Sequence, residues 1–228
     1  MKFEKKNILA HRGCWKRYSS KDKNSSRALF KALEMGFGIE TDIRFYKSNL
    51  IISHDQFIES KSFPNILYLD NLLDFYKSNN CKGLLALNIK EDGMSEYLYQ
   101  KLNKYDINNY FVFDASVPEL VNLSNVLEHV YTRESEYEDS LMTNSLKIAG
   151  VWIDSFTGNL DYFLKIKKCQ NFFKNIALVS PELHSRPHKD LWKKLLRYKL
   201  ELYPLSMLEK VMICTDFPEE LYNFMDEF

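Results

Sequence analysis

The chain has 228 residues, of which 45% are hydrophobic, enough to bury the core of one substantial domain. Its 31 basic residues balance 31 acidic ones, so it lacks the overall positive charge that gathers nucleic acid or anionic lipid. No stretch approaches the roughly 18 uninterrupted apolar residues of a membrane span. The charged start, MKFEKKNILAHRG, also lacks the apolar run of a signal peptide.

The cysteine pattern indicates reduced thiols, and the glycine and proline content indicates a single domain. Cys14, Cys81, Cys169 and Cys214 are scattered without CxxC spacing, which argues against a zinc knuckle or a disulfide framework. With no export signal, we expect reduced thiols and a cytoplasmic location. Only 7 glycines and 6 prolines are spread along the chain with no linker-like segment, so a single domain over residues 1–228 is predicted.

Short apolar runs alternate with longer amphipathic segments. The short runs are almost wholly apolar, as in parallel strands covered on both faces. The longer segments repeat apolar residues at three- and four-residue steps, which predicts helices with one buried face. Strands are predicted at 7–11, 38–43, 84–90, 110–114, 128–132, 149–154, 176–180 and 211–216, and helices at 25–36, 69–79, 95–105, 159–169 and 190–200.

Eight strand–helix units in this length predict an α/β fold, a compact (β/α)8 TIM barrel. A doubly wound open sheet is the competing architecture, but no GxGxxG follows the first strand. In a barrel the C-terminal ends of the strands converge on one face, where active sites lie. Polar residues end most of the predicted strands: His11, Arg12, Glu40, Asp42, Asn88, Lys90, Asp114, Asp154, Ser180, Glu182, Thr215 and Asp216.

The first strand, LAHRG, ends in His11, Arg12 and Gly13. The planar guanidinium of Arg12 matches phosphate oxygens, and Gly13 lets the backbone turn tightly beside a ligand. A salt bridge from Arg12 to an acidic neighbour is the structural alternative, and it is compatible with phosphate binding.

The second strand carries Glu40 and Asp42, two residues apart and therefore on the same side. Two close carboxylates repel unless a cation lies between them, and hard oxygen ligands suit Mg²⁺ or Ca²⁺. The alternative is a surface E-x-D pair with lysine partners.

The next apolar run, LIISHD, ends in His54 and Asp55. Histidine titrates near neutrality and can move protons in either direction. Together with His11 it would supply the two proton-transfer groups that cleavage of a phosphodiester needs. A capping or packing histidine in a loop is the alternative.

AHRG, an asparagine opening a helix (Asn24), GIETDI, LIISHD and the late ICTDFP together resemble the glycerophosphodiester phosphodiesterase family. That family belongs to the barrel superfamily of phosphatidylinositol-specific phospholipase C. The resemblance implies a metal-dependent phosphodiesterase of lipid metabolism, with His11 and His54 as the acid/base pair and Arg12 on the phosphate. It also implies that Glu40 and Asp42 ligate Mg²⁺ or Ca²⁺.

Three departures from the family pattern follow. The third strand of the family usually reads Glu-x-Lys, whereas LALNIK has Asn88 with Lys90 retained. We expect Asn88 to act as a neutral ligand, directly or through water, and the metal to bind more weakly. Lys23 replaces a usual Glu, and a short 55–69 segment predicts a small cap and an open pocket.

The loop SPELHSRPH contains Glu182, His184 and Arg186, which could recognise a second anionic or sugar-like group on the substrate. A polar loop whose Pro187 starts the next helix is an equal alternative. Trp152 is a candidate for stacking on a sugar or glycerol, or else a core residue.

We therefore expect hydrolysis of a small-molecule, glycerophosphodiester-like substrate, with Arg12 and Lys90 stabilising the phosphoryl charge. One alternative is a lyase that stops at a cyclic phosphate. Another is a catalytically weakened barrel that binds a phosphorylated metabolite or glycan precursor, and a third is a merely solvated polar rim. The natural diester and the oligomeric state stay open.

Overall fold

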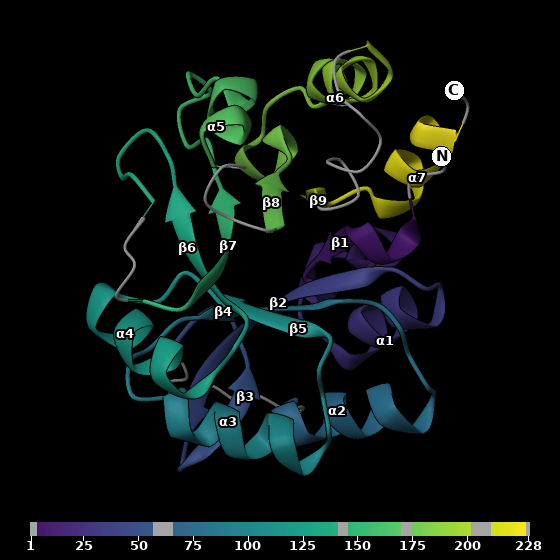
Figure 1. The fold of residues 1–228 in the computed structure, drawn as a ribbon. Helices are drawn as coiled ribbons and strands as arrows, with labels where there is room; N and C mark the ends of the chain where they lie inside the picture. Colours follow the sequence, from purple (N-terminus) through teal and green to yellow (C-terminus); the bar gives the residue numbers. More distant parts are fainter. Residues whose placement is uncertain (1–3, 57–65, 141–145, 170–174, 202–210, 227–228) are drawn as a thin grey trace.

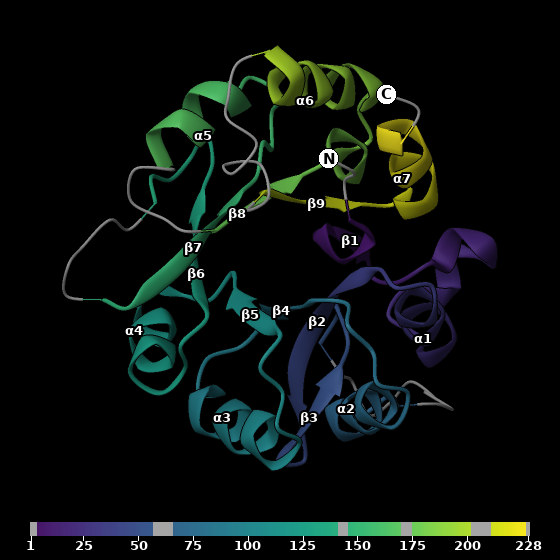
Figure 2. The same cartoon turned by 45° about the vertical axis from the view of Figure 1, so that its right-hand side comes forward.

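A closed ring of eight parallel strands forms the centre of the molecule, and the computed structural model describes residues 4–56, 66–140, 146–169, 175–201 and 211–226. The ring closes because β1 pairs with both β2 and β9. Helices surround it in the two views of Figures 1 and 2. The strands are β1 (Ile8–His11), β2 (Gly38–Tyr46), β4 (Leu85–Ile89), β5 (Tyr110–Phe113), β6 (Val130–Glu134), β7 (Ile148–Ile153), β8 (Asn175–Val179) and β9 (Val211–Thr215).

Seven α-helices cover the ring in the described part of the chain. Each turns an apolar stripe toward the strands, as the three- and four-residue spacing predicts. They are α1 (Ser26–Glu34), α2 (Leu69–Ser78), α3 (Ser95–Lys104), α4 (Val117–Val126), α5 (Tyr162–Cys169), α6 (Lys189–Glu201) and α7 (Pro218–Asp226). The (β/α)8 barrel expected from the sequence is thereby confirmed.

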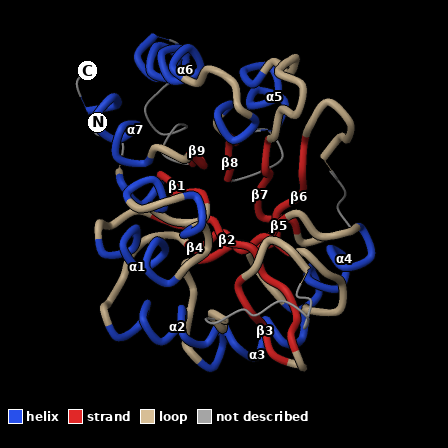
Figure 3. Tube along the Cα trace, turned by 180° about the vertical axis from the view of Figure 1, so that it is seen from behind, coloured by secondary structure: helices blue, strands red, loops and turns tan. Residues whose placement is uncertain are grey.

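Several boundaries differ from the prediction. The second strand continues to Tyr46 and turns back as β3 (Asn49–Ile52), an antiparallel strand outside the ring (Figure 3). β6 runs from Val130 to Glu134 rather than over 128–132, because it pairs with β7 from Val130 as far as Glu134, and Lys165 forms an ion pair with this buried glutamate. The helices α4 and α7 were not predicted. The expected short cap falls largely on 57–65, outside the described residues.

The core has two parts. One lies between the strands and the surrounding helices, and the other fills the interior of the ring. Inside the ring, aromatic side chains stack in pairs: Phe111 on Tyr131 and Phe113 on Trp152, each with ring centroids 4.0 Å apart. The barrel is therefore a packed core rather than a pore. None of the helices in the described residues combines the length and apolarity that crossing a bilayer requires.

Candidate active site

Strand register brings the predicted residues of the first three ring strands to one end. His11 on β1 lies opposite Glu40 on β2, and Asp42 on β2 lies opposite Asn88 on β4. Neighbouring parallel strands in this register place their C-terminal side chains side by side. The convergence expected from the barrel is thus present in the structure.

His11 is held by the residue that directly follows the last strand of the ring, β9. Its Nδ1 lies 2.7 Å from Oδ1 of Asp216, and the indole N–H of Trp15 donates to the same oxygen at 3.2 Å. Burial alone would raise the pKa of Asp216, but the bond to His11 and its charge outweigh burial and lower it. Sequence reasoning noted Asp216 as a polar strand end without giving it a role. Its place in ICTDFP was the available signal.

The turn after β1 adopts a backbone that few residues tolerate. Arg12 has φ 56° and Gly13 has φ 82°. A Cβ on Gly13 would lie 2.5 Å from the carbonyl carbon of Ala28, so only glycine fits. The turn directs Nε of Arg12 to 3.0 Å from Oδ2 of Asp42. The salt bridge anticipated as an alternative therefore exists, and it positions Arg12 within the site.

Asp42 is fixed by an asparagine that lies just before the N-cap of α1, Ser25. Asn24 donates through Nδ2 to Oδ2 of Asp42 at 2.8 Å, and its Oδ1 accepts from the Thr41 hydroxyl at 2.8 Å. Asn24 itself has φ 61°, a left-handed conformation that asparagine tolerates. Asn24, quoted only as part of the resemblance, therefore sets the orientation of a predicted metal ligand.

Lys90 and two further charged residues extend the site along the ring. Nζ of Lys90 lies 3.3 Å from Oδ1 of Asp42 and 3.5 Å from Oδ2 of Asp114, which also bonds to Arg133. Burial opposes ionisation of Asp42, but Arg12 and Lys90 outweigh burial and hold its pKa below the ordinary value. In Asp114 burial dominates over both cations, and the pKa is raised.

The three predicted metal ligands fit a hard cation. Glu40, Asp42 and Asn88 each have one buried oxygen without a hydrogen-bond partner, namely Oε2, Oδ1 and Oδ1. Burial and the neighbouring Asp42 raise the pKa of Glu40 to about 7. Within the described ranges no cluster of three His, Cys, Asp or Glu suits a metal, because the third oxygen here belongs to an amide. Two carboxylates and one amide carbonyl form a donor set for Mg²⁺ or Ca²⁺.

His54 is less firmly held than His11. Its side chain is 48% exposed and its Nδ1 lies 2.8 Å from the exposed carboxylate of Asp55. The backbone N–H of Ser53 donates to the carbonyl of Asp42 at 3.0 Å, so this segment lies at the same end of the ring as Asp42. Its role as the second proton-transfer group stays a prediction.

The predicted substrate residues near β7 and β8 have different settings. Nε2 of His184 lies 2.7 Å from Oδ1 of Asp154. Glu182 instead accepts from the hydroxyl of Thr215 and the backbone N–H of Asp216, so it supports the end of β9. Trp152 is only 5% exposed inside the ring. Contact with substrate stays a prediction for all three predicted residues, His184, Glu182 and Trp152.

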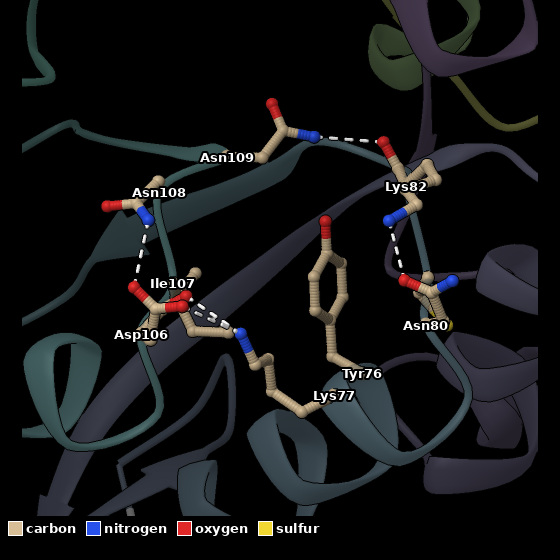
Figure 4. Close-up of a pocket in the computed structure, with 9 residues that line it drawn as sticks. Tyr76, Lys77, Asn80, Lys82, Asp106, Ile107, Asn108 and Asn109 are labelled. Atoms are coloured by element: carbon tan, nitrogen blue, oxygen red, sulfur yellow. Dashed lines mark hydrogen bonds and ion pairs between the residues drawn. The ribbon is translucent and has the colours of Figure 1, made fainter.

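A separate pocket of about 400 Å³ lies at the opposite end of the barrel, before β4 and β5 (Figure 4). Its polar side chains bind one another: Lys77 lies 3.2 Å from Asp106, and Asn109 donates to the carbonyl of Lys82 at 2.9 Å. This pocket shares no residue with the cluster around His11. The candidate active site is that cluster, at the C-terminal end of the strands.

No family model and no curated protein matches the chain. Solved structures with the same fold do match it. A glycerophosphodiester phosphodiesterase from Parabacteroides distasonis superposes with a TM-score of 0.72 at 17% identity over 98% of each chain. A candidate glycerophosphodiester phosphodiesterase from Galdieria sulphuraria gives 0.72 at 18% identity, over 99% of this chain and 98% of that one. A glycerophosphodiester phosphodiesterase from Agrobacterium tumefaciens gives 0.65 at 13% identity, over 95% and 98%. The fold thus supports the resemblance to glycerophosphodiester phosphodiesterases that the sequence motifs indicate.

Proposed function

We propose that the chain is a metal-assisted phosphoric diester hydrolase acting on a small glycerophosphodiester-like substrate. The observation that carries the proposal is the juxtaposition, at one end of the ring, of the His11–Asp216 pair with Arg12 and with the Glu40 and Asp42 oxygens that accept no hydrogen bond. A proton-transfer group, a phosphate-binding cation and a hard-cation site together are what cleavage of a phosphodiester requires.

Arg12 and Lys90 would bind the phosphoryl oxygens. Both approach Asp42, which holds the two cations near each other despite their mutual repulsion. A guanidinium and an ammonium fixed beforehand stabilise developing phosphoryl charge without reorganising during the reaction.

Glu40, Asp42 and Asn88 would hold Mg²⁺ or Ca²⁺. When bound, such an ion polarises a phosphoryl oxygen and lowers the pKa of the attacking hydroxyl or water. Asn88 already donates through Nδ2 to Oε1 of Glu40 at 3.3 Å, which leaves its carbonyl oxygen available as a ligand. With a neutral third ligand, the ion is held by two negative charges and binds more weakly.

His11 would transfer its proton through Nε2. Asp216 engages Nδ1 and thereby fixes the ring orientation and tautomer, and Nε2 is turned toward Glu40 at 3.9 Å. His54, the more exposed histidine, would serve as the second group.

The direct test is incubation of the protein with glycerophosphocholine and bis(p-nitrophenyl) phosphate in Mg²⁺, Ca²⁺, Mn²⁺ or EDTA, followed by phosphorus NMR of the products. Metal-dependent formation of a phosphomonoester supports the hydrolase. A cyclic phosphate that persists identifies a lyase. If neither product forms from either diester with any metal, the result contradicts phosphodiester cleavage for these substrates and favours a phosphate-binding barrel.

A further inference from the structure

Phe156 is an exposed aromatic residue at the catalytic end. It follows β7, two residues beyond Asp154, and is 38% exposed, whereas the aromatic residues inside the ring are buried. Its ring centroid lies 5.3 Å from that of His184, edge to face, and 6.0 Å from that of Tyr137. Phe156 and Tyr137, which is 75% exposed, are thus two neighbouring exposed aromatic residues rather than one scattered surface residue.

The backbone around Phe156 is clamped from two loops. The Glu136 carboxylate accepts from the N–H of Phe156 at 2.9 Å and the N–H of Thr157 at 3.2 Å, and from the hydroxyls of Ser155 and Thr157 at 2.6 and 2.9 Å. From the other side, Arg186 donates to the carbonyls of Phe156, at 3.1 Å, and Ser155. A side chain displayed on such a fixed loop loses little entropy when a ligand packs against it.

Phe156 is connected to the phosphate-binding residues. The guanidinium carbon of Arg133 lies 5.5 Å from the centre of the Phe156 ring. Arg133 also bonds to Asp114, which contacts Lys90. Two charged residues, Arg133 and Asp114, therefore connect the Phe156 ring to Lys90, which is proposed to hold the phosphoryl group.

The charged side chains near Phe156 are already engaged by other groups of the protein. Arg133 bonds to both Asp114 and Glu138, and Asp154 bonds to His184. Glu136 is occupied by its four hydrogen bonds, so each of these carboxylates, in the part of the chain that the structure describes, already has a partner. The Arg133 guanidinium beside the ring disfavours a cationic group. Arg186 is engaged by two carbonyls, so it offers little to a second anion. The surroundings suit a neutral, polar partner.

We infer that Phe156 is a stacking platform for a neutral ring, a sugar or cyclic polyol, carried by the alcohol of the diester. The inference rests on the proposed hydrolase function and names its substrate class. The apolar C–H face of such a ring packs on the aromatic face, while its hydroxyls meet polar groups that fix orientation. His184 uses Nε2 for Asp154, so its Nδ1 binds a substrate hydroxyl.

The test compares kcat/KM for glycerophosphoinositol, which carries a neutral ring, with that for glycerophosphoethanolamine, which carries none. Three variants are used: Phe156→Ala, Phe156→Trp and, as a matched exposed aromatic on α3, Tyr99→Ala. Phe156→Ala is expected to lose about tenfold or more on the inositol diester, mainly through KM, and less than about twofold on the ethanolamine diester. Phe156→Trp restores the loss, and Tyr99→Ala changes neither substrate.

Equal loss on both diesters, or no loss on the inositol diester, overturns the platform. If the unchanged protein cleaves neither diester, the proposed hydrolase fails for these substrates, and calorimetric titration with inositol 1-phosphate then decides the platform separately. Weaker binding by Phe156→Ala than by the unchanged protein supports it. Equal binding, or none by either protein, overturns it.

Discussion

His11 and Asp216 lie 205 residues apart in the chain, yet Nδ1 of the histidine is 2.7 Å from Oδ1 of the aspartate. The contact spans the first and last strands of the ring, β1 and β9, which pair directly. The strand pairing that closes the barrel therefore also brings the two residues of the proposed proton-transfer pair together. The indole of Trp15 donates to the same aspartate oxygen and limits its rotation.

Replacing Asp216 by Asn should lower kcat about 100-fold or more with a small change in KM, because the carboxylate no longer stabilises the proton on Nδ1. Steady-state kinetics on a glycerophosphodiester measures this. Trp15→Phe, which removes only the indole N–H, is the matched control and should cost less than about tenfold. An unchanged kcat, or a loss fully matched by the unfolded fraction in circular dichroism, would mean that Asp216 does not assist proton transfer.

Asn88→Glu should tighten metal binding and lower the stability of the metal-free protein against unfolding. The new carboxylate adds a negative ligand beside Glu40 and removes the amide that donates to its Oε1. The expected result is half-maximal activation at a lower Mg²⁺ concentration, together with about 1–2 kcal/mol less stability in EDTA. Thermal unfolding with and without Mg²⁺ measures the second effect. A variant as stable as the original protein in EDTA, with unchanged Mg²⁺ dependence, would exclude position 88 from the metal site.

Glu119→Gln should destabilise the fold by about 2 kcal/mol. Glu119 lies on α4 and is 1% exposed, and its carboxylate accepts from the backbone N–H groups of Gly93, Met94 and Ser95 where α3 begins. A buried negative charge at a helix N-terminus satisfies donors that have no partner within the helix. Urea unfolding checks this, with the exposed Glu96→Gln expected to stay within about 0.5 kcal/mol. Equal stability of the two variants would count against the cap.

The sequence predicted the barrel because its strands are apolar and its helices amphipathic, and these patterns depend on local spacing alone. Pairing with β7 and the ion pair from Lys165 place Glu134 inside β6, and a charged residue gives no such signal locally. The run before His54 was identified as apolar, but its antiparallel pairing with β2 as β3 was not. Strand pairing is a tertiary property that a single run does not reveal.

In the candidate site too, local motifs were predicted from the sequence and tertiary contacts were not. Motif spacing located His11, Arg12, Glu40 and Asp42, and the structure places their side chains together. Apart from the ICTDFP motif, nothing in the sequence pointed to Asp216 as the partner of His11, because many acidic residues end strands and closure of the ring selects among them. The clamp around Phe156 likewise joins the loops after β6, β7 and β8, which no local pattern connects.

Acid should loosen the loop after β7 through Glu136. Burial would raise the pKa of this carboxyl, but hydrogen bonds from Ser155, Thr157 and Phe156 outweigh burial and lower it from 4.5 to about 2. A lowered pKa in the folded state contributes stability above the ordinary carboxyl pKa and loses it as the pH falls toward 2. Unfolding by urea at several pH values from 5 to 2 should therefore show a smaller pH dependence for Glu136→Gln than for the unchanged protein. Parallel curves would contradict this assignment.

The most direct test of the central claim is kcat/KM of His11→Ala on a glycerophosphodiester with Mg²⁺, beside His129→Ala as a control. His129 lies before β6, at the opposite end of the barrel, where its ring meets Tyr110. The account predicts a loss of about a thousandfold for His11→Ala and an unchanged rate for His129→Ala. Metal-dependent cleavage that survives in His11→Ala at the original rate would contradict it.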